Sequence, residues 1–373
     1  MDKHYLTPLF SPQSVLVFAG NQEDAAAAFA QAKALYANLT AQRFNGEIRF
    51  VDIQTTGTLA DLALARADLA IIALPHTEVA AALEVAGRMK CKAALVISAG
   101  MGADLAADLK RIARRSGMHL LGPNCLGMQR PYIGLNASVA GTLAAKGPLG
   151  LVSQSGALTS SILDWAHSNG VGFSAVVSLG PNTVVDLADV LDFLAADAQT
   201  QSIVVYMEGI GNARRFMSAL RAAANAKPVV VLKAGRKPAG NAAAQTHSGT
   251  IVGSDDVFAA ALRRAGAVRV RSFVELFSAA KCLASRYRPV GKRLAIVTNG
   301  GGPGVLAADW VSELELQLAR LSPAVAEELK SKISPLASLT DLIDLGEDAH
   351  PDCYTAALEA AAKDTNVDGV LAI

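Results

Sequence analysis

Short apolar runs alternate with alanine-rich stretches of helical spacing along the whole chain of 373 residues. The runs "SVLVFAG", "LAIIAL" and "AALVISAG" have the length and the nearly continuous apolarity of strands that are buried on both faces of a parallel sheet. Stretches with helical periodicity, such as 24–38 and 78–88, lie between the apolar runs. This alternation predicts an α/β fold with parallel sheets.

The predicted strands form three sets along the chain. The first set predicts a Rossmann-like unit within residues 1–130, with strands at 14–20, 48–53, 69–74, 93–100 and 119–124. A stretch rich in Gly, Pro and Asn, 127–148, is predicted to be a connector. The second set predicts a domain at 147–289, and the third set, which opens with "RLAIVTNGGG", predicts a domain at 290–373.

The last residues, "VDGVLAI" at 367–373, form an apolar run typical of a buried parallel strand. Such a strand needs neighbours to cover it. We therefore expect the chain to be a piece of a longer protein, with the third domain incomplete.

Composition and charge argue against several classes of protein. The net charge of +1 gives no electrostatic reason to expect binding to nucleic acid or to an acidic membrane surface. The N-terminus lacks an apolar signal core, and no apolar run approaches the ~20 residues of a membrane helix, so we expect a cytoplasmic protein. The 4 cysteines form no CxxC pair, so neither a metal site nor a disulfide framework is predicted.

Two predicted strand–turn–helix elements are suited to binding anions. In one, an apolar strand leads into Ser153, Gln154, Ser155 and Gly156; in the other, a strand leads into Gly300, Gly301 and Gly302. Backbone N–H groups at the start of a helix are unpaired and carry partial positive charge, so each turn could hold a phosphate. The alternative is that both turns merely connect a strand to a helix. Neither matches the GxxxxGK[ST] motif.

The loop "NAAAQTHSGTIVGSDD" places His247 among small side chains. A histidine that accepts a phosphoryl group needs a carboxylate to fix its tautomer and donors for the phosphoryl oxygens. Glu208, at the end of a predicted strand, is the candidate carboxylate, because ligand sites of α/β proteins gather at strand carboxyl ends. From composition alone, a surface-loop histidine is the simpler interpretation.

The first turn, "FAGNQEDAAAAF", has one glycine where a GxGxxG fingerprint needs three. It also places Glu23 and Asp24 near the position of the anion, where their charges would compete with a phosphate. This pattern argues against a standard dinucleotide site, and so against a Rossmann oxidoreductase.

The segments "LLGPNCLG", "GLVSQSGAL", "ILDWA", "YMEGI", "RRF", "KPVVVLKAGR", "THSGTIVGSDD" and "AIVTNGGGPGVLAAD" occur in this order. Together they resemble the NDP-forming acyl-CoA synthetases, a superfamily that includes the alpha subunit of succinyl-CoA synthetase. The chain is also similar to the N-terminal part of protein lysine acetyltransferases that carry a fused GNAT domain. The resemblance implies a Rossmann-like CoA-binding domain followed by two flavodoxin-like domains.

The resemblance also implies roles for individual residues. His247 matches the histidine that is transiently phosphorylated, and Glu208 matches the glutamate that orients it. The two glycine-bearing turns correspond to the phosphate-binding positions. The residues implied for the CoA site are Pro75, Ser98, Pro123 and Asn124. A mobile histidine loop explains the small residues around His247, because Gly and Ser leave room for a phosphate.

The reaction implied for the family converts acyl-CoA, ADP and phosphate into carboxylate, ATP and CoA. ATP, ADP and Mg²⁺ would bind to an ATP-grasp domain or a beta-type subunit that this chain lacks, so the chain alone is not expected to complete the reaction. The chain departs from the family at its first turn, at Ser178–Asp186, where relatives read S-L-G-N-x-A-D-V-D, and at Asp341–Leu345, where they read N-P-V-D-L. These departures resemble the GNAT-fused branch, so the alternative function is a region that senses acyl-CoA or a related ligand.

Overall fold

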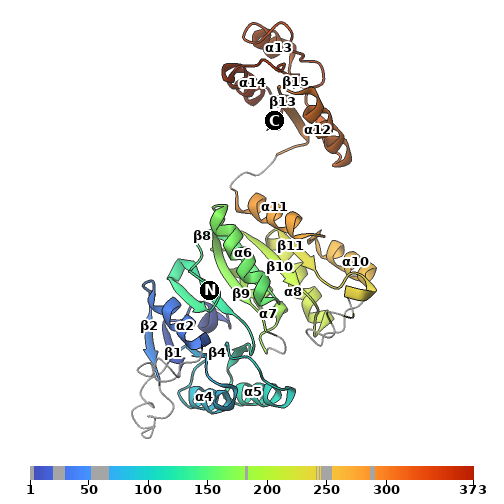
Figure 1. Cartoon of the computed structure of the whole chain (residues 1–373). Coiled ribbons are helices and arrows are strands. Elements are labelled where there is room, and N and C mark those ends of the chain that lie inside the picture. The colour runs from blue at the N-terminus through green and yellow to red at the C-terminus, as the bar shows by residue number, and fades with distance from the viewer. Residues whose placement is uncertain are drawn as a thin grey trace. The chain divides into compact units, whose positions relative to one another are not determined.

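The computed structural model describes residues 4–19, 30–51, 67–180, 184–240, 242, 244, 254–285 and 290–373. The chain divides into two compact units, Met1–Ser285 and Arg286–Ile373 (Figure 1). Unit 1 contains a five-stranded and a seven-stranded sheet, and unit 2 contains a four-stranded sheet. The alternation of strands and helices confirms the predicted α/β class.

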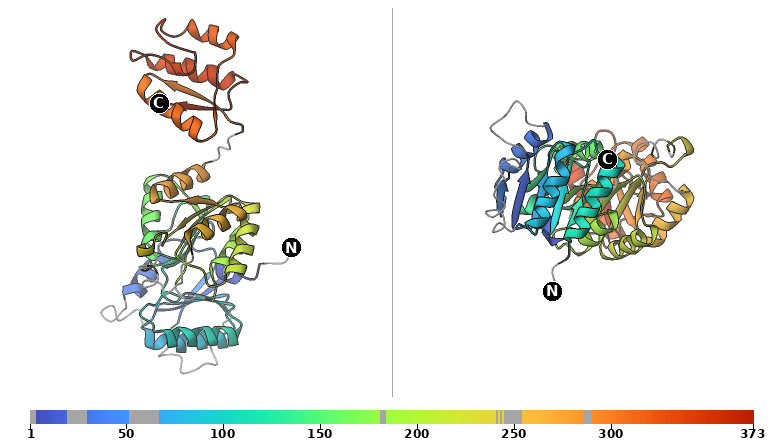
Figure 2. Two further views of the ribbon diagram at one scale, coloured as in Figure 1. Left: turned by 90° about the vertical axis from the view of Figure 1, so that its right-hand side faces the viewer. Right: turned by 90° about the horizontal axis from the view of Figure 1, so that it is seen from below.

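The first sheet of unit 1 has five parallel strands in the order β2-β1-β3-β4-β5. Its strands are β1 (Ser14–Phe18), β2 (Glu47–Phe50), β3 (Leu69–Ile72), β4 (Ala93–Val96) and β5 (His119–Leu121). The helices beside it are α1 (Thr7–Phe10), α2 (Ala30–Thr40), α4 (His76–Arg88) and α5 (Ala103–Ser116). Figures 1 and 2 show α4 and α5 side by side along one face of the sheet.

Both faces of the inner strands β1, β3 and β4 are buried, which explains their nearly continuous apolar sequences. In β3, Leu69 and Ile71 enter a core that also contains residues of α1 and α2. The alternate residues Ala70 and Ile72 enter a second core with residues of α4 and α5. Because side chains of a strand alternate between the two faces, each face needs its own set of apolar positions.

The second sheet has seven strands in the order β12-β11-β10-β8-β9-β6-β7. Its strands are β6 (Gly127–Arg130), β7 (Leu135–Ser138), β8 (Lys146–Ser153), β9 (Phe173–Ser178), β10 (Ser202–Met207), β11 (Val229–Lys233) and β12 (Val268–Val270). The helices of this part are α6 (Gly156–Ser168), α7 (Leu187–Ala196), α8 (Ala213–Ala226), α10 (Asp255–Ala265) and α11 (Phe273–Ala284), and η1 (Pro131–Ile133) joins β6 to β7.

The prediction of a connector at 127–148 was wrong, because β6 and β7 lie in it and the start of β8 overlaps its end. Strand β6 pairs antiparallel with both β7 and β9, so this sheet is mixed rather than purely parallel. These strands contain polar residues, so the pattern of apolar runs did not predict them. The buried Gln129 donates to the hydroxyl of Ser138, which in turn donates to Asn136, so the polar groups satisfy one another.

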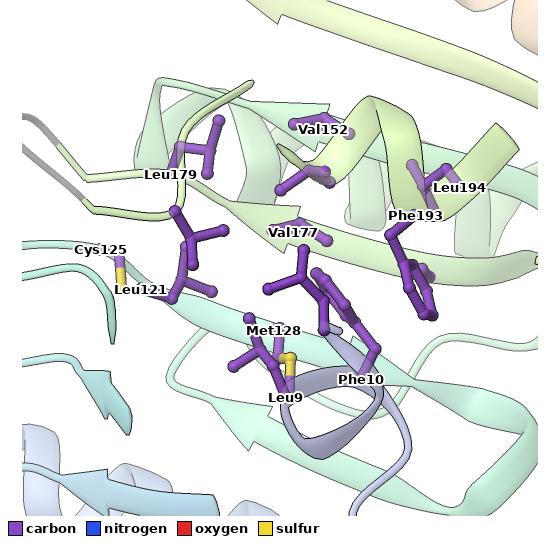
Figure 3. Packing of buried hydrophobic residues seen from close by; sticks show 14 of the residues in the cluster. Leu9, Phe10, Leu121, Cys125, Met128, Val152, Val177, Leu179, Phe193 and Leu194 are labelled. Atoms are coloured by element: carbon purple, nitrogen blue, oxygen red, sulfur yellow. The ribbon is translucent and has the colours of Figure 1, made fainter. Parts of the chain in front are cut away.

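The two sheets of unit 1 share one hydrophobic core (Figure 3). Phe10 of α1 stacks on Phe193 of α7 with ring centroids 4.3 Å apart. Leu9 and Met128, which come from α1 and β6, belong to the same cluster. The division into domains at 1–130 and 147–289 therefore stays a prediction, because the core itself is continuous across it.

Unit 2 is built around β13 (Arg293–Thr298), which pairs in parallel with three strands. The other elements are α12 (Gly301–Glu313), β14 (Gln317–Leu318), α13 (Pro323–Lys330), β15 (Ile343–Asp344), α14 (Pro351–Lys363) and β16 (Gly369–Ala372). The run at 367–373 does form a parallel strand, β16. It was expected to be buried, but Val370 and Leu371 are partly exposed because β16 pairs only with β13 among the described residues.

No helix within the described ranges is both long and apolar enough to cross a bilayer.

Candidate active site

The turn between β8 and α6 is fixed by the hydroxyl group of Ser153. This hydroxyl donates to the carbonyl of Ser155 at 2.8 Å and accepts from the N–H of Ser155 at 3.1 Å. Ser155 caps the helix by accepting from the N–H of Leu158. The N–H groups of Gly156 and Ala157 have no acceptor among the residues that the structure describes. The turn therefore presents unpaired donors at the positive end of a helix.

Gln154 joins this turn to the end of the neighbouring strand. Its Oε1 accepts from the N–H of Glu208 at 2.6 Å and from the N–H of Gly209 at 3.1 Å. Its Nε2 donates to the carbonyl of Gly209 at 3.0 Å. Strands β8 and β10 are parallel neighbours, with Ser153 opposite Tyr206, so the residues that follow them meet at one edge of the sheet.

Glu208 is a buried carboxylate, with 6% of its surface exposed. Among the described residues, its side chain has one hydrogen-bond partner, the hydroxyl of Tyr206, which donates to Oε1 at 3.5 Å. Burial, followed by the charge and the hydrogen bond of Glu208, raises the pKa of Tyr206 to about 12. The hydroxyl of Tyr206 thus remains a donor at neutral pH, and the carboxylate keeps acceptor capacity for a further partner.

The predicted catalytic residue His247 lies outside the described residues. The chain leaves the sheet at the end of β11 and returns at α10, and the segment that carries His247 lies between them. Its role therefore stays a prediction.

The four residues predicted for the CoA site gather at the carboxyl ends of β3, β4 and β5. Ser98 accepts from the N–H of Leu74 at 2.9 Å through its hydroxyl, and its carbonyl accepts from the N–H of Asn124 at 3.0 Å. Pro75 caps α4 and is exposed, as is Asn124, whereas Ser98 and Pro123 are buried. Pro75 and Asn124 are thus available to a ligand, while Ser98 holds the strand ends together.

The GPN segment also contacts the end of β9, next to the turn at Ser153–Gly156. A Cβ atom on Gly180 would lie 2.0 Å from the carbonyl oxygen of Pro123, so only glycine permits this approach. The N–H of Leu126 donates to the hydroxyl of Ser178 at 3.2 Å. The N–H of Leu179 donates to the carbonyl of Ser153 at 2.7 Å. These contacts bring the two predicted sites to one junction between the sheets of unit 1.

Unit 2 repeats the geometry of the first turn. The hydroxyl of Thr298, the last residue of β13, donates to the carbonyl of Gly300 at 2.9 Å and accepts from its N–H at 3.1 Å. Gly300 precedes α12, and the N–H groups of Gly301 and Gly302 have no acceptor within the described ranges. The predicted phosphate-binding role of these glycines stays a prediction.

Sequence reasoning assigned no site role to Tyr206, Ser178 or Gly180. Tyr206 could have been predicted, because it stands two residues before Glu208 and side chains two positions apart on a strand share a face.

The buried Cys125 donates to the carbonyl of Val96, and burial raises the pKa of its thiol to about 12, as expected of a structural cysteine.

Comparisons with known proteins identify relatives of this chain. The family model of the succinyl-CoA ligase like flavodoxin domain matches residues 146–283. The chain is 41% identical over 312 residues to the ADP-forming acetate–CoA ligase I of Archaeoglobus fulgidus, across 82% of this chain and 45% of that protein. It is 34% identical over 377 residues to the alpha subunit of the ADP-forming acetate–CoA ligase I of Pyrococcus furiosus, across 95% of this chain and 80% of that subunit.

A solved structure supports the same relationship. The dinucleotide forming acetyl-coenzyme A synthetase 1 of Ca. Korarchaeum cryptofilum, in complex with phosphate and ADP, matches with a TM-score of 0.90 and 28% identity. The match covers 98% of this chain and 81% of that chain. The chain thus spans about half the length of its Archaeoglobus relative but most of the Pyrococcus alpha subunit. As its motifs predicted, the chain belongs to the family of ADP-forming acyl-CoA synthetases and resembles the alpha subunit of their two-subunit members.

Proposed function

We propose that this chain is the CoA-binding and phosphohistidine-carrying part of an ADP-forming acyl-CoA synthetase. The observation that carries the proposal is the pair of hydrogen bonds by which Gln154 fixes the backbone of Glu208 and Gly209 beside the start of α6. These bonds link the strand end that carries a buried carboxylate to the turn that carries the unpaired amide donors. A histidine that exchanges a phosphoryl group needs both.

In the first proposed step, an oxygen of inorganic phosphate attacks the carbonyl carbon of the acyl-CoA thioester. The C–S bond breaks, CoA leaves as its thiolate and an acyl phosphate forms. The exposed Pro75 and Asn124 would contact the CoA moiety, and the buried Ser98 and Pro123 would support them. The N–H groups of Gly156 and Ala157 would hold the phosphate oxygens, because the helix start is unpaired there.

In the second step, a ring nitrogen of His247 attacks the phosphorus atom of the acyl phosphate, and the carboxylate leaves. The carboxylate of Glu208 would accept the N–H of the other ring nitrogen, which fixes the tautomer and stabilises the charge that develops on the ring. The histidine would then pass its phosphoryl group to ADP.

The last transfer requires a nucleotide site that we assign to an ATP-grasp domain or a beta-type subunit, together with Mg²⁺. The Gly300–Gly302 turn is proposed to hold phosphate oxygens through its unpaired N–H groups. The chain by itself should therefore not convert ADP to ATP, and measurable conversion by the 373-residue chain would contradict this assignment.

The test uses the protein that contains this chain together with its ATP-grasp domain or subunit, incubated with acetyl-CoA and labelled phosphate. The wild type should take up acid-labile, base-stable label, and His247→Ala should take up none. His167→Ala is the matched control, because His167 lies in the last turn of α6 and has no role in the proposal. Labelled wild type supports the ligase. Absence of label in the wild type favours the alternative, a ligand-sensing region attached to a GNAT domain.

A further inference from the structure

Lys233, the last residue of β11, is a buried cation with only 1% of its surface exposed. Within the part of the chain that the structure describes, no carboxylate lies within ion-pair distance of its Nζ. Burial lowers the pKa of Lys233, the nearby charge of Asp255 raises it, and that of Arg269 lowers it. Burying an ammonium group is costly, so the contacts that it makes need an explanation.

The ammonium group of Lys233 contacts two separate parts of the chain. It donates to the carbonyl of Ala234 at 2.9 Å and to the carbonyl of Gly235 at 3.4 Å, where the chain leaves the sheet. It also lies 5.0 Å from the ring centroid of Phe258 in α10, where the chain returns. Residues 237–254 run between these two ends, so one cation contacts both.

Ionic contacts with Asp255 reinforce the same junction. Arg236 Nε lies 4.0 Å from Asp255 Oδ2, which again pairs the outgoing end with the returning end. Arg269 of β12 donates to Asp255 Oδ1 at 2.5 Å. Because β12 is hydrogen-bonded to β11, this contact ties the start of α10 to the sheet.

The junction is also connected to Glu208. Lys233 is paired with Met207 in the parallel register of β10 and β11, and the N–H of Ala234 donates to the carbonyl of Met207 at 2.9 Å. Met207 immediately precedes Glu208. The backbone that carries Lys233 is therefore fixed beside the strand that leads into Glu208.

We propose that Lys233 is a positioning residue for phosphoryl transfer, because its ammonium group joins both ends of the 237–254 segment at the end of β11, the neighbour of the strand that leads into Glu208. The inference rests on the proposed function, since His247 belongs to that segment. Packing alone does not account for an ammonium group here. An apolar side chain of similar length would fill the same space without the cost of burying a charge.

The experiment compares wild type, Lys233→Met and Lys233→Arg in the complete protein. Lys233→Met should slow the phosphorylation of the histidine by about 10- to 100-fold, because a small misplacement of a reacting group has effects of this size. The KM for acetyl-CoA should stay the same, because its proposed site lies at the ends of β3, β4 and β5. Amide hydrogen exchange at Ala234–Arg236 and Asp255–Phe258 should become faster by about tenfold. Lys233→Arg, which keeps the positive charge, should change both the phosphorylation rate and the hydrogen exchange less than Lys233→Met does.

Lys227→Met is the matched control. The ammonium group of Lys227 also donates to two carbonyls, those of Leu194 and Asp197, each at 2.6 Å, but at the start of β11 rather than its end. This substitution should change neither the rate of phosphorylation nor hydrogen exchange at the two ends of the 237–254 segment.

If the histidine of the Lys233→Met variant is phosphorylated as fast as that of the wild type, the inference is refuted. If the wild type itself takes up no label, the proposed function fails, and hydrogen exchange alone then decides whether Lys233 joins the two ends. Unchanged exchange at both ends refutes that junction, and faster exchange supports it. If Lys233→Met does not fold, Phe258→Leu, which removes the ring that faces the ammonium group, provides the same comparison.

Discussion

Gln154 and Glu208 are the first residues after two neighbouring parallel strands, and the carboxamide oxygen of Gln154 lies 2.6 Å from the amide nitrogen of Glu208. The two residues are 54 positions apart in the sequence. The donor is the backbone N–H of Glu208, so the hydrogen bond fixes the main chain from which the side chain extends. The carboxylate stays free to accept a hydrogen bond from another donor. Two strand ends are thereby held as one site.

Gln154→Ala tests this relationship directly. The substitution leaves the N–H groups of Glu208 and Gly209 without their acceptor, which should lower the free energy of unfolding by about 1–3 kcal/mol. It should also slow histidine phosphorylation by about 100-fold, because the carboxylate loses its fixed position. Denaturant unfolding and uptake of labelled phosphate measure the two effects.

Gln129→Ala is the control for Gln154→Ala. Gln129 is a buried glutamine of β6 that accepts from the N–H of Ala144 at 2.9 Å. Its loss should destabilise the chain by a similar amount and leave phosphorylation of the remaining folded protein unchanged. Equal losses of activity in both variants would show that Gln154 acts through general stability alone.

Glu208→Gln should separate chemistry from stability. The amide has the shape of the carboxylate but no charge, so it does not stabilise an imidazolium ring. We expect histidine phosphorylation to fall by at least about 100-fold. The unfolding midpoint should stay the same or rise, because a buried charge is removed. Glu275→Gln, at an exposed carboxylate that accepts from the N–H of Arg271, should keep full activity.

Gly180→Ala tests the contact between the two sheets of unit 1. The added Cβ would lie 2.0 Å from the carbonyl oxygen of Pro123 and 2.9 Å from that of Asn124, so the backbone must shift. We expect a loss of about 1–3 kcal/mol in the free energy of unfolding, together with a higher KM for acetyl-CoA. Gly211→Ala, where a Cβ meets no atom within 4 Å, should be nearly neutral. Equal stability of the two variants would refute the steric argument.

The buried ion pair of Arg130 and Asp197 predicts a pH dependence of stability. Burial favours the neutral form of Asp197, but the hydrogen bonds and charge of Arg130 outweigh it and lower the pKa of Asp197. A carboxyl group with a lowered folded-state pKa binds fewer protons when folded than when unfolded. Its stabilisation is therefore present above about pH 4, the unfolded value, and is lost as the pH falls through the folded value.

Asp197→Asn should remove this contribution. The Arg130 side chain is only 4% exposed, so it is left buried without its counter-charge, and we expect a cost of about 3–5 kcal/mol at pH 7. Stability should then change less steeply on acidification than in the wild type. Denaturant midpoints measured from pH 7 to pH 3 check both expectations. Asp108→Asn, which removes an exposed pair with Arg111, should leave the whole profile unchanged.

Several parts of the fold followed from local sequence. The apolar runs at β1, β3 and β4 predicted buried parallel strands, because both faces of such strands must be apolar. The serine and glycine residues around Ser155 predicted the turn into α6, since capping a helix depends on residues within one turn of it. These features depend on residues that lie a few positions apart, so they can be predicted from the sequence alone.

Only the tertiary structure decided which distant residues meet. Strands β6 and β7 escaped prediction because their buried Gln129 and Asn136 find polar partners that the local pattern does not reveal. In the same way, the sequence contained Gln154, Glu208 and Lys233 but not the strand order that gathers them at one edge of the sheet. Strand order and register are set by packing across the whole core, so contacts between distant residues appear only once the chain has folded.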